Sequence, residues 1–199
     1  MQPNHSDSER ALQQAARRRQ RLLYSLNDLQ QALSASAFLH ELDEGEEYSK
    51  VDLRRFRCFE TTLVIAYTRP FTQSKGGYPP LTMKMIDFHP TPENRALHDQ
   101  LMQMRNQIVA HSDAAMMRMT IAPFDIPFDD GTPSINLFQA VFDEGVTLIG
   151  SLLLETDVLL HEVYSALFRT LFKDVQKDPA LFDLRIDSDG AKLARNLRV

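Results

Sequence analysis

The residues with the greatest chemical potential lie near the middle of the chain, where Arg105 and Asn106 are followed by His111. A guanidinium binds and neutralises phosphate, and an imidazole moves protons close to neutral pH. Together these groups could cleave a phosphodiester without a metal ion. No other segment of the sequence offers comparable chemistry.

Helical spacing places Arg105 and His111 on opposite flanks of one apolar stripe. The stripe is formed by Leu97, Leu101, Met104 and Ile108. On an ideal helix Arg105 lies roughly 50–70° to one side of the stripe and His111 roughly 60° to the other, with a rise of about 9 Å between them. One copy is therefore a poor active site. A two-fold dimer, which brings each residue close to its own symmetry mate, would make a better one.

The same spacing has a simpler interpretation. A chain rich in arginine contains so loose a pattern about once by chance. A histidine in the last turn of a helix also interacts favourably with the helix dipole and the free carbonyls. In that interpretation His111 closes the helix, Ser112 and Asp113 begin a turn, and Arg105 is a solvated flank.

Periodic apolar residues predict four helices that would position this motif. They span about 9–40, 49–69, 91 to the motif, and 133–177, with Thr91 as an N-cap and Pro70 ending the second helix. The fourth is long for one straight helix, so we expect a kink or break at one of two glycines, Gly145 or Gly150.

Two connections depart from the helical period. Residues 72–90 are rich in Gly, Pro and Ser and predict a long loop, of the kind that is often functional or mobile. Residues 117–122 alternate between apolar and polar side chains, which predicts a short strand, and Pro123 and Pro127 limit it to an edge or ribbon.

These patterns predict an all-α fold, an up-and-down bundle of four to five helices with a short β-ribbon insertion after the third. We expect a flexible N-terminus at 1–8, one helical domain at 9–178 and a C-terminal tail at 179–199.

Composition narrows the functional classes. The formal net charge of -5 disfavours a protein that grips many phosphates over its whole surface, so nucleic-acid contact must be local. The single cysteine, Cys58, excludes an internal disulfide framework and a cysteine zinc cluster, and fits a reducing, cytoplasmic setting. The six histidines show no metal-ligand spacing.

The longest apolar stretch, 146–154, is too short to span a bilayer, and we expect no secretory signal.

The motif resembles the signature of HEPN domains, an arginine, often followed by Asn or Asp, and then a histidine four to six residues later. The Val-Ala-His-Ser-Asp ending at 109–113 looks like the branch found in abortive-infection-type proteins, and the Tyr-Thr-Arg-Pro-Phe segment at 67–71 is similar to one in such proteins. The resemblance covers about 9–175. It implies an α-helical homodimer with a composite, metal-independent ribonuclease site, no cofactor, and a toxin or defence role with a possible cognate antitoxin.

The resemblance also implies residue roles. Arg105 would bind the scissile phosphate, His111 would act as general base or acid, and Asn106 would orient the histidine or the phosphate by hydrogen bonding. Three further residues are expected to contact the RNA substrate, namely Arg69, Tyr67 and Ser112. The alternative function is a catalytically silent helical dimer that binds RNA, nucleotide or a protein partner.

Several of these residues have structural alternatives. Arg69 could instead complement a helix dipole, and Tyr67 could belong to the core. The basic runs at 17–21 and 54–57 could contact RNA, although such runs are usually solvated faces with carboxylate partners.

Overall fold

The computed structural model describes residues 5–74, 77–110, 119–126, 135–142 and 145–179. Within these ranges the chain is mostly helical, with four long helices. In chain order the elements are α1 (His5–Leu39), α2 (Lys50–Thr68), the short 3-10 helices η1 (Arg69–Phe71) and η2 (Met83–Ile86), α3 (Pro92–Ala110), β1 (Met119–Ile126), β2 (Ile135–Phe142) and α4 (Gly150–Lys177).

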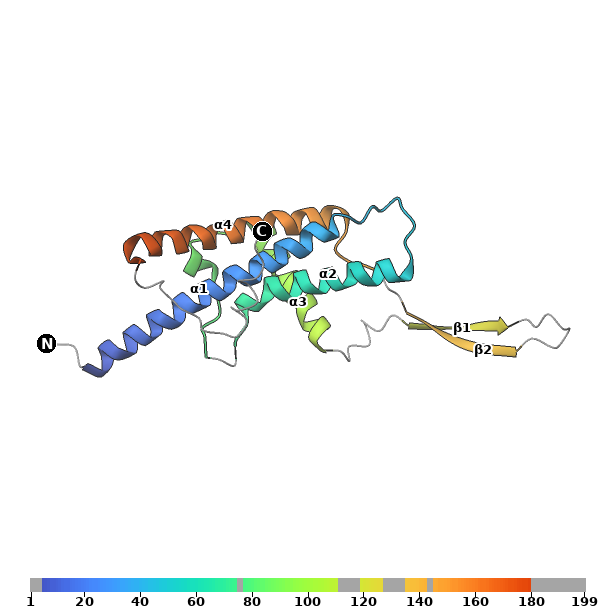
Figure 1. Ribbon diagram of the computed structural model, residues 1–199, viewed down its shortest axis with the longest axis horizontal. Helices are drawn as coiled ribbons and strands as arrows, with labels where there is room; N and C mark the ends of the chain where they lie inside the picture. The colour runs from blue at the N-terminus through green and yellow to red at the C-terminus, as the bar shows by residue number, and fades with distance from the viewer. Residues whose placement is uncertain (1–4, 75–76, 111–118, 127–134, 143–144, 180–199) are drawn as a thin grey trace, which may run out of the picture.

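α1, α2 and α4 run along the long axis of the molecule, with α1 packed against both of the others (Figure 1). α3 packs against α2. β1 and β2 form an antiparallel pair that runs from Met119 opposite Phe142 to Ile126 opposite Ile135. This pair projects away from the helices beyond one end of α2 (Figure 1).

The periodic apolar residues that predict the first three helices face the core. Leu22 and Leu29 of α1 and Leu63 of α2 are fully buried, and so is Leu101 of α3. Met104 and the other flanking members of these stripes are partly buried against the same core. The first three helices therefore form where the sequence predicts them. Burial of such an apolar face supplies most of a helix's stability in a protein.

Two predicted helix boundaries are also confirmed. The Thr91 hydroxyl accepts a hydrogen bond from the Asn94 N–H at 3.2 Å. α2 ends at Thr68, and Pro70 lies in the 3-10 turn that follows. α1, in contrast, begins at His5, so residues 5–8 belong to the helix and not to the predicted flexible N-terminus.

The prediction of one helix over 133–177 is wrong. Residues 135–142 form β2, and α4 begins only at Gly150. Gly150 has φ +53°, outside the right-handed helical region. Pairing with β1 supplies backbone hydrogen bonds to β2. Local periodicity in the sequence contains no information about that pairing.

The long loop predicted at 72–90 is largely packed onto the helices where it is described. Leu81 and Ile86 belong to the core, and the Leu81 N–H donates to the Pro70 carbonyl at 2.8 Å. Arg21 of α1 donates through Nε to the Pro79 carbonyl at 2.7 Å. The described part of this loop is thus a structural layer of the bundle.

Candidate functional site

Arg105 and Asn106 lie in the last two turns of α3. Arg105 is half-buried beside the apolar stripe and Asn106 is exposed. Arg105 Nη1 donates to Asn106 Oδ1 at 3.0 Å. A guanidinium carries five N–H donors in a planar fork, so this bond holds one edge of the group and leaves capacity for an oxyanion.

The other half of the motif lies outside the described residues. α3 is described to Ala110, and His111 and Ser112 follow it directly in the sequence. The geometry that joins His111 to Arg105, and the expected substrate contact of Ser112, therefore stay predictions.

Arg69, the expected second phosphate ligand, forms an ion pair. Its Nη1 donates to Asp28 Oδ1 at 2.7 Å, and the Asp28 side chain is only 8 % exposed. Burial raises the pKa of the Asp28 carboxyl, whereas the charge and hydrogen bond of Arg69 lower it. Arg69 thus compensates a buried carboxylate of α1 and ties the end of α2 to that helix.

Tyr67, the expected base-stacking residue, is completely buried. Its hydroxyl lies 2.9 Å from His98 Nδ1, and its ring also contacts Phe71. Burial raises the pKa of the phenol well above its usual range. A ring enclosed in this way offers no face to a nucleotide base, and the structure agrees with the core alternative for Tyr67.

His98 was not singled out by the sequence analysis, yet it lies on the same flank of α3 as Arg105. The two are seven residues apart, which is two helical turns and about 10 Å. His98 is half-buried between Tyr67 and Phe71, whose ring centroids lie 5.8 Å and 4.7 Å away. Burial lowers the pKa of its imidazole, which favours the neutral ring. The seven-residue spacing, which places His98 on the same flank as Arg105, was visible in the sequence. It did not show that His98 contacts Tyr67 of α2 and Phe71 of η1.

The basic runs contribute internal contacts. Arg18 donates to Asp174 Oδ2 of α4 and to the Met85 carbonyl, both at 3.3 Å, and Arg57 donates to the Gly145 carbonyl at 2.6 Å. An arginine that makes such contacts could bind a phosphate only after breaking them, which would remove their contribution to stability. These three bonds favour the structural interpretation of the runs.

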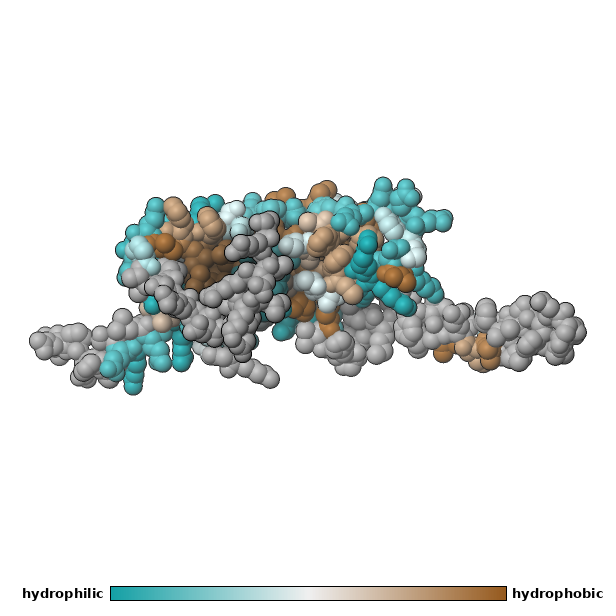
Figure 2. All heavy atoms as spheres, in the orientation of Figure 1, coloured by the Kyte–Doolittle hydropathy of each residue, from teal (hydrophilic) through white to brown (hydrophobic). Residues whose placement is uncertain are grey.

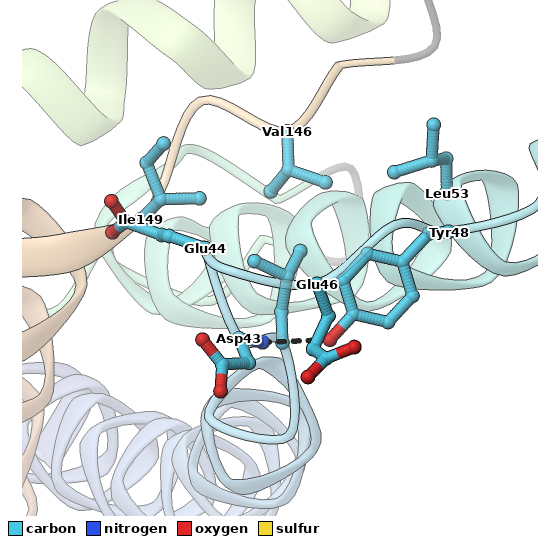
Figure 3. Close-up of a pocket in the computed structure, with 8 residues that line it drawn as sticks. Asp43, Glu44, Glu46, Tyr48, Leu53, Val146 and Ile149 are labelled. Atoms are coloured by element: carbon cyan, nitrogen blue, oxygen red, sulfur yellow. Dashed lines mark hydrogen bonds between the residues drawn. The ribbon is translucent and has the colours of Figure 1, made fainter.

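An open hollow of about 320 Å³ separates the α1–α2 connection from residues 146–149. Asp43, Glu44 and Glu46 line it together with Val146 and Ile149, and the Asp43 N–H donates to the Tyr48 hydroxyl at 2.8 Å (Figure 3). Three carboxylates in one hollow repel a phosphate backbone, so this hollow does not suit RNA.

Neither a metal centre nor a membrane span is found in the described ranges. No group of three or more His, Cys, Asp or Glu side chains could hold an ion there. No helix in the same ranges is long and apolar enough to cross a bilayer.

Comparison of the chain with protein-family models, curated proteins and solved structures gave no match.

Proposed function

We propose that the protein is a metal-independent endoribonuclease of the HEPN type, with a toxin or defence role. The observation that carries the proposal is the Arg105–Asn106 pair, joined by a 3.0 Å hydrogen bond at the end of α3. His111 comes five residues after Asn106 in the sequence. The pair presents donors to an oxyanion, and the histidine supplies a group that titrates near neutral pH.

In this proposal His111 removes the proton from a ribose 2′-hydroxyl, and O2′ attacks the adjacent phosphorus. The bond from phosphorus to O5′ breaks, and O5′ takes up a proton from a second imidazole. The products are a 2′,3′-cyclic phosphate and a 5′-hydroxyl end. Arg105 stabilises the charge that develops on the non-bridging oxygens, and Asn106 holds the guanidinium through its amide oxygen.

The proposed site is composite and needs two copies of the chain. Arg105 and His111 lie on opposite flanks of a helix with a rise of about 9 Å between them. A two-fold axis next to the end of α3 would bring Arg105 of one copy towards His111 of the other. It would also supply the second imidazole that protonates the leaving oxygen.

The test uses the full chain with structured RNA in the presence of EDTA. We expect the wild type to cleave and to leave cyclic phosphate ends, and we expect the Arg105→Ala/His111→Ala variant to be inactive. The matched control is Arg95→Ala/His89→Ala, which removes an arginine from the exposed face of α3 and an exposed histidine. This control should cleave like the wild type.

Two results contradict the proposal. One is an absence of cleavage by folded wild type across diverse RNAs, which would favour the silent binding dimer. The other is cleavage that EDTA abolishes, since it would show a metal-dependent reaction.

A further inference from the structure

α4 carries apolar side chains on two opposite faces. One face forms the core with Leu159, Leu160 and Val163, all fully buried. Most surface helices are polar on the opposite side. On α4 that side instead exposes five large apolar residues, and their exposed fractions are 59 % for Leu154, 56 % for Val158, 52 % for Phe168, 54 % for Phe172 and 37 % for Val175.

These five residues, called the outer stripe below, follow a heptad pattern. With His161 and Ser165 in the middle, the positions are separated alternately by four and three residues over the length of α4. On a 100° wheel all of them fall within about 60° of one line, opposite the buried face. Figure 2 shows hydrophobic side chains at the upper edge of the molecule, over α4. This spacing is the one that allows two helices to pack along a continuous seam.

Two open hollows lie beside the outer stripe. A hollow of about 360 Å³ lies between Leu154 and Val158 of α4 and Leu97 of α3. A second hollow of about 370 Å³ follows it, between His161 and Ser165 of α4 and Phe88. The two hollows lie along the same edge of the stripe.

The charges along that edge indicate which helix fits. Glu155, Glu162 and Arg169 recur every seven residues, so this edge of α4 is acidic along its first half and basic along its second. Lys173 and Lys177 add positive charge near the basic end. An antiparallel copy of α4 places each acidic half against a basic half. A parallel copy would place acidic against acidic and basic against basic. Edge charges of this kind select the orientation of paired helices.

We propose that the outer stripe is a homodimer interface, in which α4 packs antiparallel against α4 of a second copy. The heptad register places Val158 opposite Val175 and the small Ser165 opposite Phe168. Glu162 of each copy faces Arg169 of the other. This interface is separate from the two-fold contact proposed for the ribonuclease site, because Leu97 lines a hollow with α4 whereas His98, on the flank of Arg105, contacts Tyr67 of α2. A chain that uses both contacts forms an assembly larger than a dimer.

The first test measures the oligomeric state of the full chain by sedimentation velocity, with circular dichroism as a check on folding. We expect the wild type to associate through the outer stripe, as a dimer when this is the one contact in solution and as a larger assembly when the contact at the end of α3 also forms. Val158→Asp should weaken dimerisation roughly 100-fold or more, because it buries two charges in the seam. The matched control is Val51→Asp, which places the same charge at an exposed valine of α2, and it should dimerise like the wild type.

The second test exchanges the edge charges. Glu162→Arg and Arg169→Glu should each weaken the dimer roughly tenfold, and the double variant should restore it. Within one helix the two residues are seven apart, beyond the spacing at which side chains pair, so the rescue must be intermolecular. Asn94→Ala controls for the 2.7 Å hydrogen bond from Asn94 to Glu162.

A monomeric wild type, or a Val158→Asp variant that forms assemblies of the same size and the same tightness as Val51→Asp, would overturn the proposal. A double variant that stays as weak as the single variants would overturn the antiparallel pairing. A monomeric wild type would also contradict the composite ribonuclease site, whereas a loss of association in Val158→Asp tests the outer stripe alone and leaves the ribonuclease proposal to its own test.

Discussion

Glu60 allows a sharp test of how the ribbon is anchored to the helices. Its carboxylate is buried on α2, with the residue only 4 % exposed. Oε1 accepts the backbone N–H groups of Thr147 and Leu148 at 2.6 Å and 2.7 Å. These residues connect β2 to α4, so Glu60→Ala should release that connection from the bundle.

The magnitude follows from the two hydrogen bonds. A bond to a charged acceptor contributes roughly 1.5–3 kcal/mol, and a buried donor left unpaired adds a penalty. Thr147 is exposed, and its N–H can regain water, which favours the lower end of the range. We therefore expect Glu60→Ala to lower the free energy of unfolding by about 3 kcal/mol. Glu60→Gln keeps a neutral acceptor and should cost roughly half as much.

Urea unfolding followed by circular dichroism measures both variants, and an unchanged denaturant slope would show that only stability has changed. The matched control is Glu47→Ala, which removes an exposed glutamate from the α1–α2 connection. It should unfold at the wild-type midpoint. A loss below about 1 kcal/mol for Glu60→Ala would refute the reasoning, since it would mean that the two N–H groups find equal partners in water.

Two further predictions concern His98 and Gly150. Burial lowers the pKa of His98 below its ordinary value of 6.5, so the unfolded chain binds that proton more readily than the folded one. Wild-type stability should fall as the pH drops from about 7 to 5, and His98→Gln should flatten that slope in urea titrations; parallel curves would contradict the assignment. Gly150→Ala should cost about 1 kcal/mol in thermal unfolding, because an L-residue is strained at φ +53°, whereas the Glu44 carboxylate that lies 2.8 Å from the added Cβ can swing aside. Gly45, whose added Cβ would have its nearest contact at 3.4 Å, is the matched site; equal losses at both glycines would argue against strain at Gly150.

The helical framework could be predicted because its signals are local. Leu97, Leu101 and the capping hydroxyl of Thr91 lie within four turns of one another, and the structure buries the two leucines and uses the cap as expected. The β2 segment could not be predicted in the same way. Its apolar residues are compatible with helix or strand, and its pairing with β1 decides between them.

The candidate site likewise has a part that local sequence signals predict and a part that depends on tertiary contacts. Arg105 and Asn106 were placed correctly on α3, but the roles of Arg69 and Tyr67 depended on α1 and α3. Arg69 meets a buried carboxylate from α1, 41 residues earlier in the chain. Tyr67 meets His98, 31 residues later. Asp28 and His98 are both too far away in the sequence for helical periodicity to predict these contacts.

The sequence by itself determined the first three helices, which of their faces are apolar, and that an arginine–asparagine pair lies in the last two turns of the third helix. Local backbone preference and the 3.6-residue period suffice for those features. Only the tertiary structure decided that Tyr67 is core, that Arg69 compensates Asp28, and that α4 keeps a second apolar face exposed. Those outcomes depend on which surfaces meet once the helices pack, and a periodic apolar pattern identifies a surface without identifying its partner.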